Sequence, residues 1–207
     1  MENSTAETIR GFLVTVFIIL LLAVSDARGE PVMEDESGIY LGLKMIGSSL
    51  HVDEEDQPFF EDDGGGIEFD FGYRFNPTFA LELGLGGAKH ETVETSIDAY
   101  FAMLHILGVY RFCPDRPFRP YLKGGFGGYS LRVEEDAASA EISGGGIVLG
   151  AGFRYFFSEH FAMGIDLTHN MIRYDEGKVS LGELSYQTAI DEEGAQTSFG
   201  LTFSYSF

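Results

Sequence analysis

The sequence of 207 residues has no tryptophan, a single cysteine and few positive charges. Because Cys113 is the only cysteine, no disulfide can form within the chain. The 13 lysine and arginine residues stand against 33 aspartate and glutamate residues, which gives a formal net charge of −20. Phosphate backbones would repel such an acidic chain, so a nucleic-acid-binding function is excluded.

No apolar segment is long enough to cross a membrane as a helix, since spanning takes roughly 20 residues. The longest, residues 11–24, follows Arg10, and Ser25 and Ala27 after it occupy the small-residue positions of a signal-peptidase site. We therefore expect a secretory signal peptide over residues 1–27, cleaved after Ala27. The alternative is an uncleaved anchor, because two acidic residues precede the segment. No cysteine follows it closely, which excludes lipoprotein processing.

The most frequent pattern in the sequence is the alternation of apolar with small or polar residues, and it is clearest in residues 199–207. A large apolar residue occupies every odd position, with glycine, serine or threonine between. A period of two predicts a strand with one apolar and one small polar face, as in a membrane barrel whose faces meet lipid and lumen. The alternative is the edge strand of a soluble sandwich.

Similar patterns recur along the chain and predict eight strands. They are expected at residues 38–47, 66–75, 79–88, 99–112, 120–131, 145–157, 161–173 and 195–207. Short turns alternate with longer acidic connections, at residues 48–65, 89–98, 132–144 and 174–194. This asymmetry is typical of outer-membrane barrels, whose turns face the periplasm and whose loops face outside.

The sequence thus predicts an all-β fold, an eight-stranded antiparallel up-and-down transmembrane β-barrel over residues 38–207. A short periplasmic segment, residues 28–37, would connect it to the signal peptide. Without residues 1–27 the chain would carry 30 acidic residues (33 − 3) and 12 lysine and arginine residues (13 − 1). About 180 residues are a natural size for one domain.

The alternation assigns charged side chains to the inner face. In the second strand Phe69 and Phe71 face outward, and in the third Leu83 does. The inward set comprises Glu68, Asp70, Glu82 and Asp166 as acids and Arg74, Arg111, Lys123 and Arg154 as bases. Four charges of each sign predict an internal salt-bridge network, because an enclosed charge is costly unless it is paired. A substrate-binding cavity is the alternative.

These strands resemble the small outer-membrane β-barrel proteins of Gram-negative bacteria, the OmpA/OmpX-like and OmpW-like group. The matching segments are residues 109–112, 119–127, 150–155 and 205–207. The resemblance implies that Phe203, Tyr205 and Phe207 form the C-terminal signal read by the barrel-assembly machinery.

The same resemblance implies an outer-membrane location and contact with lipid and lipopolysaccharide. It also implies periplasmic chaperones during biogenesis, a monomer and no cofactor. Because the sequence ends at residue 207, the cell-wall tethering of full-length OmpA-type proteins is not implied.

Three local patterns bear on other kinds of site. His169 invites comparison with outer-membrane deacylases, but position 171 is Met171 and not serine, so Ser180 or Ser185 would have to supply the nucleophile. Glycine-rich segments such as residues 124–128 are not followed by a helix, as a phosphate loop requires. The acidic connections have no EF-hand spacing, and we expect solvated charge there and no dedicated metal site.

We therefore expect no catalytic residues and a structural or surface-interaction role, which supports envelope integrity or adhesion through the acidic loops. The alternative is a narrow, porin-like channel for small solutes, favoured by the lumen glycines and the OmpW-like similarity. A lipid-modifying enzyme is a further alternative.

Overall fold

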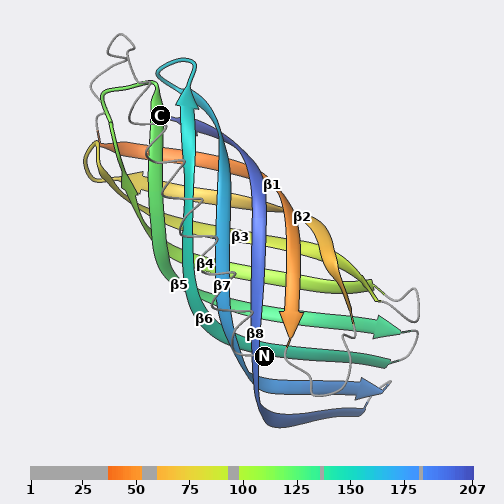
Figure 1. Ribbon diagram of the computed structural model, residues 1–207. Coiled ribbons are helices and arrows are strands. Elements are labelled where there is room, and N and C mark those ends of the chain that lie inside the picture. The colour runs from red at the N-terminus through yellow and green to blue at the C-terminus, as the bar shows by residue number, and fades with distance from the viewer. Residues whose placement is uncertain (1–36, 53–59, 93–97, 136–137, 182–183) are drawn as a thin grey trace, which may run out of the picture.

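The computed structural model describes residues 37–52, 60–92, 98–135, 138–181 and 184–207. In these residues eight strands follow one another around a closed antiparallel barrel (Figure 1). They are β1 (Gly38–Val52), β2 (Phe60–Arg74), β3 (Phe79–Thr92), β4 (Asp98–Arg111), β5 (Phe118–Glu135), β6 (Ala138–Phe156), β7 (Phe161–Leu181) and β8 (Leu184–Ser206). The described ranges contain no helix that is long and apolar enough to cross a membrane. The expected signal peptide and nearly all of residues 28–37 lie outside the described residues.

Strand β1 closes the ring, because it pairs with β2 on one side and with β8 on the other. Gly42, for example, has Asp70 as its partner in β2 and Ser204 as its partner in β8. The expected number of strands, their antiparallel order and their up-and-down connection are therefore confirmed. In a closed ring, neighbouring strands pair around the whole barrel and the membrane portion has no free edge.

The alternation of side chains turns one face of each strand outward. Leu83 is 44% exposed, and its ladder partners Phe71 and Ile106 are also exposed large apolar residues. The adjacent Glu82 is 1% exposed and points inward. An apolar outside and a charged inside suit lipid around the barrel and a protein-filled lumen within it. The predicted faces of the second and third strands are confirmed.

An aromatic girdle surrounds the barrel at the end where the short turns lie. Its members are Tyr73, Phe75, Phe79, Tyr110, Phe112, Tyr155, Phe157, Phe161, Tyr205 and Phe207, and several pack ring against ring at centroid distances near 5 Å. The turns beside the girdle are tight. Asn76 Oδ1 accepts hydrogen bonds from the backbone N–H groups of Thr78 and Phe79, at 2.9 and 2.8 Å. Aromatic rings are favoured at the level of the lipid headgroups.

The strands run further toward the other end than their sequence predicts. Residues 174–181 and 184–194, expected in a loop, belong to β7 and β8, and much of 132–144 belongs to β5 and β6. Beyond the membrane the outer face of a strand meets water and not lipid, so the apolar outer residues that mark a membrane strand are lost there. The four strands β5 to β8 have 18 to 23 residues, against 14 or 15 in β1 to β4. One half of the barrel wall therefore projects further than the other.

Candidate functional site

Lys44 is the central cation of the lumen. Its side chain is fully buried, and Nζ lies 3.2 Å from Glu68 Oε1, 3.0 Å from Asp70 and 3.6 Å from Glu82 Oε1. It brings together three of the four carboxylates that the sequence assigns to the lumen. Sequence reasoning missed Lys44, although it lies between the outward residues Leu43 and Met45 and alternation alone would have placed it inside.

Glu82 links opposite parts of the wall. Its Oε2 accepts hydrogen bonds from Arg154 Nη2 in β6 and from the Tyr40 hydroxyl in β1, both at 2.9 Å. The guanidinium of Arg154 also lies over the ring of Tyr40, 4.9 Å from its centroid. A buried carboxylate with two donors and a second cation nearby has the partners that compensate the loss of hydration.

Asp166 forms a second cluster next to the first. Its carboxylate accepts hydrogen bonds from Lys123 Nζ at 2.7 Å, the Tyr121 hydroxyl at 2.5 Å and Thr168 Oγ1 at 2.7 Å. The Tyr121 ring lies beneath the guanidinium of Arg154, at 5.3 Å, and so joins the two clusters. We call the side chains of both clusters the lumen network; its members come from β1, β2, β3, β5, β6 and β7.

The remaining two residues of the expected set lie nearer the turn end of the lumen. Arg74 donates to Ser206 Oγ at 2.9 Å, and Arg111 is buried at 3% exposure. Arg119, which the sequence analysis did not place inside, is also buried, with its guanidinium 4.1 Å from the centroid of the Phe156 ring. Among the described buried residues there are thus four carboxylates and six lysine or arginine side chains. The expected balance of four against four is wrong, because Lys44 and Arg119 were overlooked.

Glycines in the lumen make room for this network. A Cβ on Gly72 would overlap the ring of Tyr40, and a Cβ on Gly152 would lie 2.6 Å from the Tyr121 hydroxyl. Gly150 similarly underlies Lys123, since its Cβ would lie 2.6 Å from Lys123 Cε. These glycines therefore accommodate large side chains that cross the lumen, and do not leave it open.

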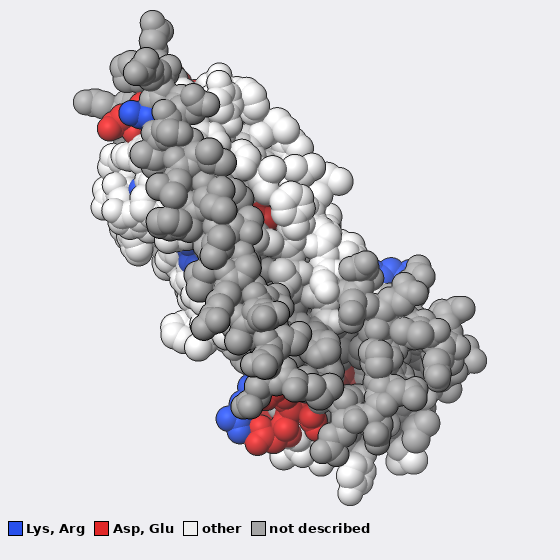
Figure 2. All heavy atoms as spheres, in the orientation of Figure 1, with Lys and Arg blue, Asp and Glu red and all other residues white. Residues whose placement is uncertain are grey.

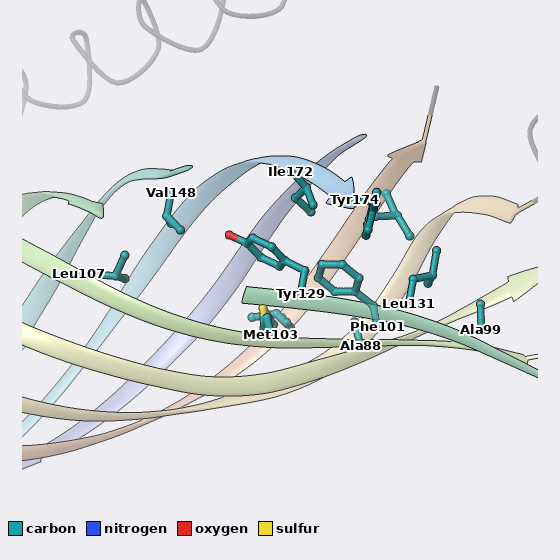
Figure 3. Close-up of a cluster of buried hydrophobic side chains, with 12 residues drawn as sticks. Ala88, Ala99, Phe101, Met103, Leu107, Tyr129, Leu131, Val148, Ile172 and Tyr174 are labelled. Carbon is teal, nitrogen blue, oxygen red and sulfur yellow. The ribbon is translucent and has the colours of Figure 1, made fainter. Parts of the chain in front are cut away.

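The half of the lumen toward the projecting end is filled by an apolar cluster (Figure 3). Twelve buried residues form it: Ile46, Leu50, Ala88, Ala99, Phe101, Met103, Leu107, Tyr129, Leu131, Val148, Ile172 and Tyr174. The rings of Phe101 and Tyr129 stack with centroids 5.8 Å apart. The cluster explains why the fourth strand is apolar on both faces. His105 of the same strand is also buried, with Nδ1 3.5 Å from Glu68 Oε1.

A belt of uncharged polar side chains lies on the inner face of β7, β8 and β1. Asn170 donates to Gln196 Oε1, and Gln196 Nε2 donates to Ser48 Oγ at 2.7 Å. All three residues are buried. Charged network, amide belt and apolar cluster together occupy the interior over most of its length.

The residues considered for catalysis are not assembled. His169 points away from the lumen and its Nδ1 lies 2.9 Å from Thr197 Oγ1, while its neighbour Asn170 points inward. Ser180 is eleven residues further along β7, or about 36 Å at the usual strand rise. Its Oγ lies 3.5 Å from Ser185 Oγ, and Asp166 is occupied within the lumen network.

The described acidic residues of β8 lie at the projecting end. Residues 53–56 fall outside the described residues, whereas Asp191, Glu192 and Glu193 are exposed on β8. In the space-filling view, acidic side chains gather at the lower end of the molecule (Figure 2). Within the described ranges, no group of three histidine, cysteine, aspartate or glutamate side chains could hold a metal ion.

The C-terminal residues Phe203, Tyr205 and Phe207 line the outer face of β8. Tyr205 pairs with Leu41 on one side and Phe161 on the other, and the backbone N–H of Phe207 donates to Ile39 O at 3.0 Å. Their rings are thus presented to the membrane on a strand that is paired along both edges.

The sequence from residue 15 to 207 matches the model of the outer membrane protein beta-barrel domain. The chain belongs to this family. Its barrel therefore lies in the outer membrane of a Gram-negative bacterium, with the apolar belt in contact with lipid and lipopolysaccharide. Comparison with curated protein sequences gives no match.

Solved structures similar to the chain include several outer-membrane proteins. Neisserial surface protein A (NspA) is 17% identical with a TM-score of 0.56, over 80% of this chain and 96% of that one. OprG from Pseudomonas aeruginosa is 16% identical with a TM-score of 0.54, over 88% and 99%. Ail of Yersinia pestis, in complex with the heparin analogue sucrose octasulfate, is 14% identical with a TM-score of 0.51, over 82% and 99%. At these identities the similarity establishes the fold.

Proposed function

We propose that the protein is a closed, non-conducting barrel that supports the outer membrane and carries an interaction surface on its projecting strands. The observation that supports this most directly is the filled lumen. Lys44 and its three carboxylates form one barrier, and the stacked rings of Phe101 and Tyr129 belong to a second, apolar one. A hydrated ion would have to displace both, and an eight-stranded barrel is only wide enough for its own side chains.

The channel alternative loses one of the two features that favoured it, the lumen glycines. Glycines on the inner face suggested space, but Gly72 and Gly152 lie beneath the rings of Tyr40 and Tyr121. The residues considered for catalysis do not support it either, because His169 and Ser180 are far apart on β7. The exposed, charged side chains of the projecting strands instead favour a surface-interaction role.

The test is single-channel conductance of the refolded protein in a planar bilayer. Refolding is checked first by the shift in electrophoretic mobility on heating that a folded barrel shows. We expect a silent bilayer at voltages where a porin control gives discrete openings. Reproducible openings would overturn the closed-barrel proposal and make the residues of the lumen network determinants of a pore.

The variant Phe101→Ala tests the apolar barrier separately from the charged one. It should destabilise the barrel by about 3–5 kcal/mol through the cavity it leaves in the apolar cluster. The bilayer should nevertheless remain silent, because the lumen network still closes the other half. Phe101→Leu, which keeps most of the volume, is the control and should cost less than about 1.5 kcal/mol.

A further inference from the structure

The last part of the β7–β8 hairpin has one unpaired edge within the described structure. β8 pairs with β7 as far as Leu184, but its pairing with β1 ends at the contact between Val52 and Gly194. Residues 184–193 therefore have a described strand on one side only. In Figure 1 this hairpin lies at the lower end of the barrel, beyond the end of β1. Backbone groups along such an edge are available to a further strand.

Residues 184–189 of this edge lack the features that usually prevent strands from adding to it, because the irregular pairing with β7 is confined to residues 190 and 191. Exposed edges are commonly protected by lysine, by proline or by charges that point toward the sheet. Residues 184–190, Leu-Ser-Tyr-Gln-Thr-Ala-Ile, contain no proline and no charged residue. Tyrosine, threonine and isoleucine among them favour the extended conformation. The segment is thus suited to pairing with an incoming strand.

One face of the edge is apolar although it lies outside the membrane belt. Leu184 and Tyr186 are 78% and 79% exposed, and Val179, the partner of Tyr186 in β7, is 49% exposed. Ile190 is on the same face and packs against the apolar cluster of the lumen. This face therefore continues the inner side of the barrel wall, where lipid does not cover it. Exposed apolar surface of this kind marks an interaction site.

The charge around this apolar face is negative. Asp175, Glu176, Asp191, Glu192 and Glu193 are exposed, against Arg173 and Lys178, which gives −3 for the described residues of the hairpin (2 − 5). Arg173 is already bound by Asp191 in a bidentate pair, with distances of 2.8 and 2.9 Å. A basic partner would be attracted to this surface and a polyanion repelled.

We propose that residues 184–193 of β8 bind an extended segment of a partner protein by strand addition, and that this segment alternates apolar and basic residues. Its apolar side chains would pack on Leu184 and Tyr186, and its basic side chains would face Glu193 and the negative charge around it. Main-chain hydrogen bonds supply affinity in this mode, and the alternate side chains supply specificity. The inference rests on the proposed surface-interaction function and specifies its partner.

The test uses the full-length protein in detergent micelles and a fluorescent nine-residue peptide of alternating valine and lysine. Two control peptides are needed: one with the same residues in separate blocks, and one with alternate backbone amides methylated. We expect the alternating peptide to bind saturably, and both controls to bind at least tenfold more weakly. Equal affinity for the methylated peptide would overturn strand addition, since only charge attraction would remain.

Protein variants locate the site. Tyr186→Ser should weaken binding of the alternating peptide at least fivefold, because it removes the largest apolar side chain of the edge. Gln187→Ser, the adjacent residue on the opposite face, is the matched control and should leave the affinity unchanged. Both variants should retain the heat-dependent mobility shift. Equal affinities for both variants would overturn the assignment of the face.

Two measurements on the protein without peptide exclude other occupants of the edge. A dimer that forms with rising concentration and is lost in Tyr186→Ser would assign the edge to a second copy of the chain. Strong protection from hydrogen exchange at those backbone amides of residues 184–193 that point away from β7 would show that the chain itself covers the edge. Either result overturns the peptide proposal.

Conductance tests the closed barrel separately, so channel openings together with normal peptide binding would refute only the proposed closed state.

Discussion

Arg154 in β6 donates a hydrogen bond across the lumen to Glu82 in β3, with 2.9 Å between Nη2 and Oε2. The two strands are not neighbours in the barrel. The other carboxylate oxygen of Glu82 lies 3.6 Å from Lys44 Nζ. A single carboxylate thus connects β1, β3 and β6. No two of these strands pair with each other in the barrel.

Removal of Arg154 should destabilise the barrel strongly. Arg154→Met leaves Glu82 buried without its hydrogen-bonded cation, and we expect a loss of about 3–5 kcal/mol in the free energy of unfolding. The double variant Glu82→Leu/Arg154→Met removes the unpaired charge and should recover part of this loss. Urea unfolding in lipid vesicles, followed by circular dichroism and gel mobility, measures both.

The exposed pair of Arg173 and Asp191 is the control for this comparison. Both side chains are 68% exposed, and Arg173→Met should cost less than about 1 kcal/mol. If Arg154→Met costs no more than Arg173→Met, the lumen network does not stabilise the barrel.

A charge on the lipid face should be costly only within the apolar belt. Leu83 lies in the middle of β3 with Phe71 and Ile106 beside it, and Leu83→Arg should destabilise the protein by about 2–4 kcal/mol. Gln187→Arg, on the part of β8 beyond the belt, should change stability by less than about 0.5 kcal/mol. Unfolding in vesicles checks both variants. Similar effects at the two positions would contradict the position of the belt.

The faces of the membrane strands could be predicted because lipid and lumen impose opposite demands on successive residues. Phe69 and Phe71 face lipid and Asp70 faces the lumen, and a shift of one residue would reverse all three. The fourth strand was harder to assign, because Phe101 and Met103 fill the lumen with apolar side chains. Both faces of β4 therefore carry apolar residues, and the sequence pattern does not distinguish the inner face from the outer one.

The outer ends of the strands and the partners of each charge could not be predicted in the same way. Acidic residues and glycines such as Glu193 and Gly194 suggested loops, whereas pairing with Arg173 and Ile172 of β7 holds them in a strand. The contact between Lys44 and three carboxylates depends on how far β1, β2 and β3 are shifted along one another. A single sequence indicates which face of its strand a residue occupies, but not its position along the barrel axis.

Cys113 adopts a backbone conformation that favours glycine. Its φ is 51°, and its carbonyl oxygen accepts a hydrogen bond from Arg116 N at 3.1 Å in the turn after β4. Cys113→Gly should remove about 1–2 kcal/mol of steric cost, offset by about 0.5–1 kcal/mol from the greater entropy of the unfolded chain. We therefore expect a stabilisation of up to about 1.5 kcal/mol in urea unfolding. Cys113→Ala keeps the Cβ atom, so an equal gain there would contradict this explanation.

Phe207 and Phe157 allow the role of the C-terminal aromatic residue in assembly to be separated from its role in packing. Their side chains are 68% and 63% exposed, and each packs edge to face on a tyrosine, Tyr205 or Tyr155, at 4.9 and 5.0 Å. Loss of either ring should cost about 0.5–1.5 kcal/mol in the refolded protein. If the assembly machinery reads the C-terminal strand, Phe207→Ala should also lower the amount of barrel in the outer membrane of growing cells several-fold, while Phe157→Ala should not. Heat-dependent gel mobility of isolated membranes measures the assembled fraction, and equal yields of the two variants would remove Phe207 from the assembly signal.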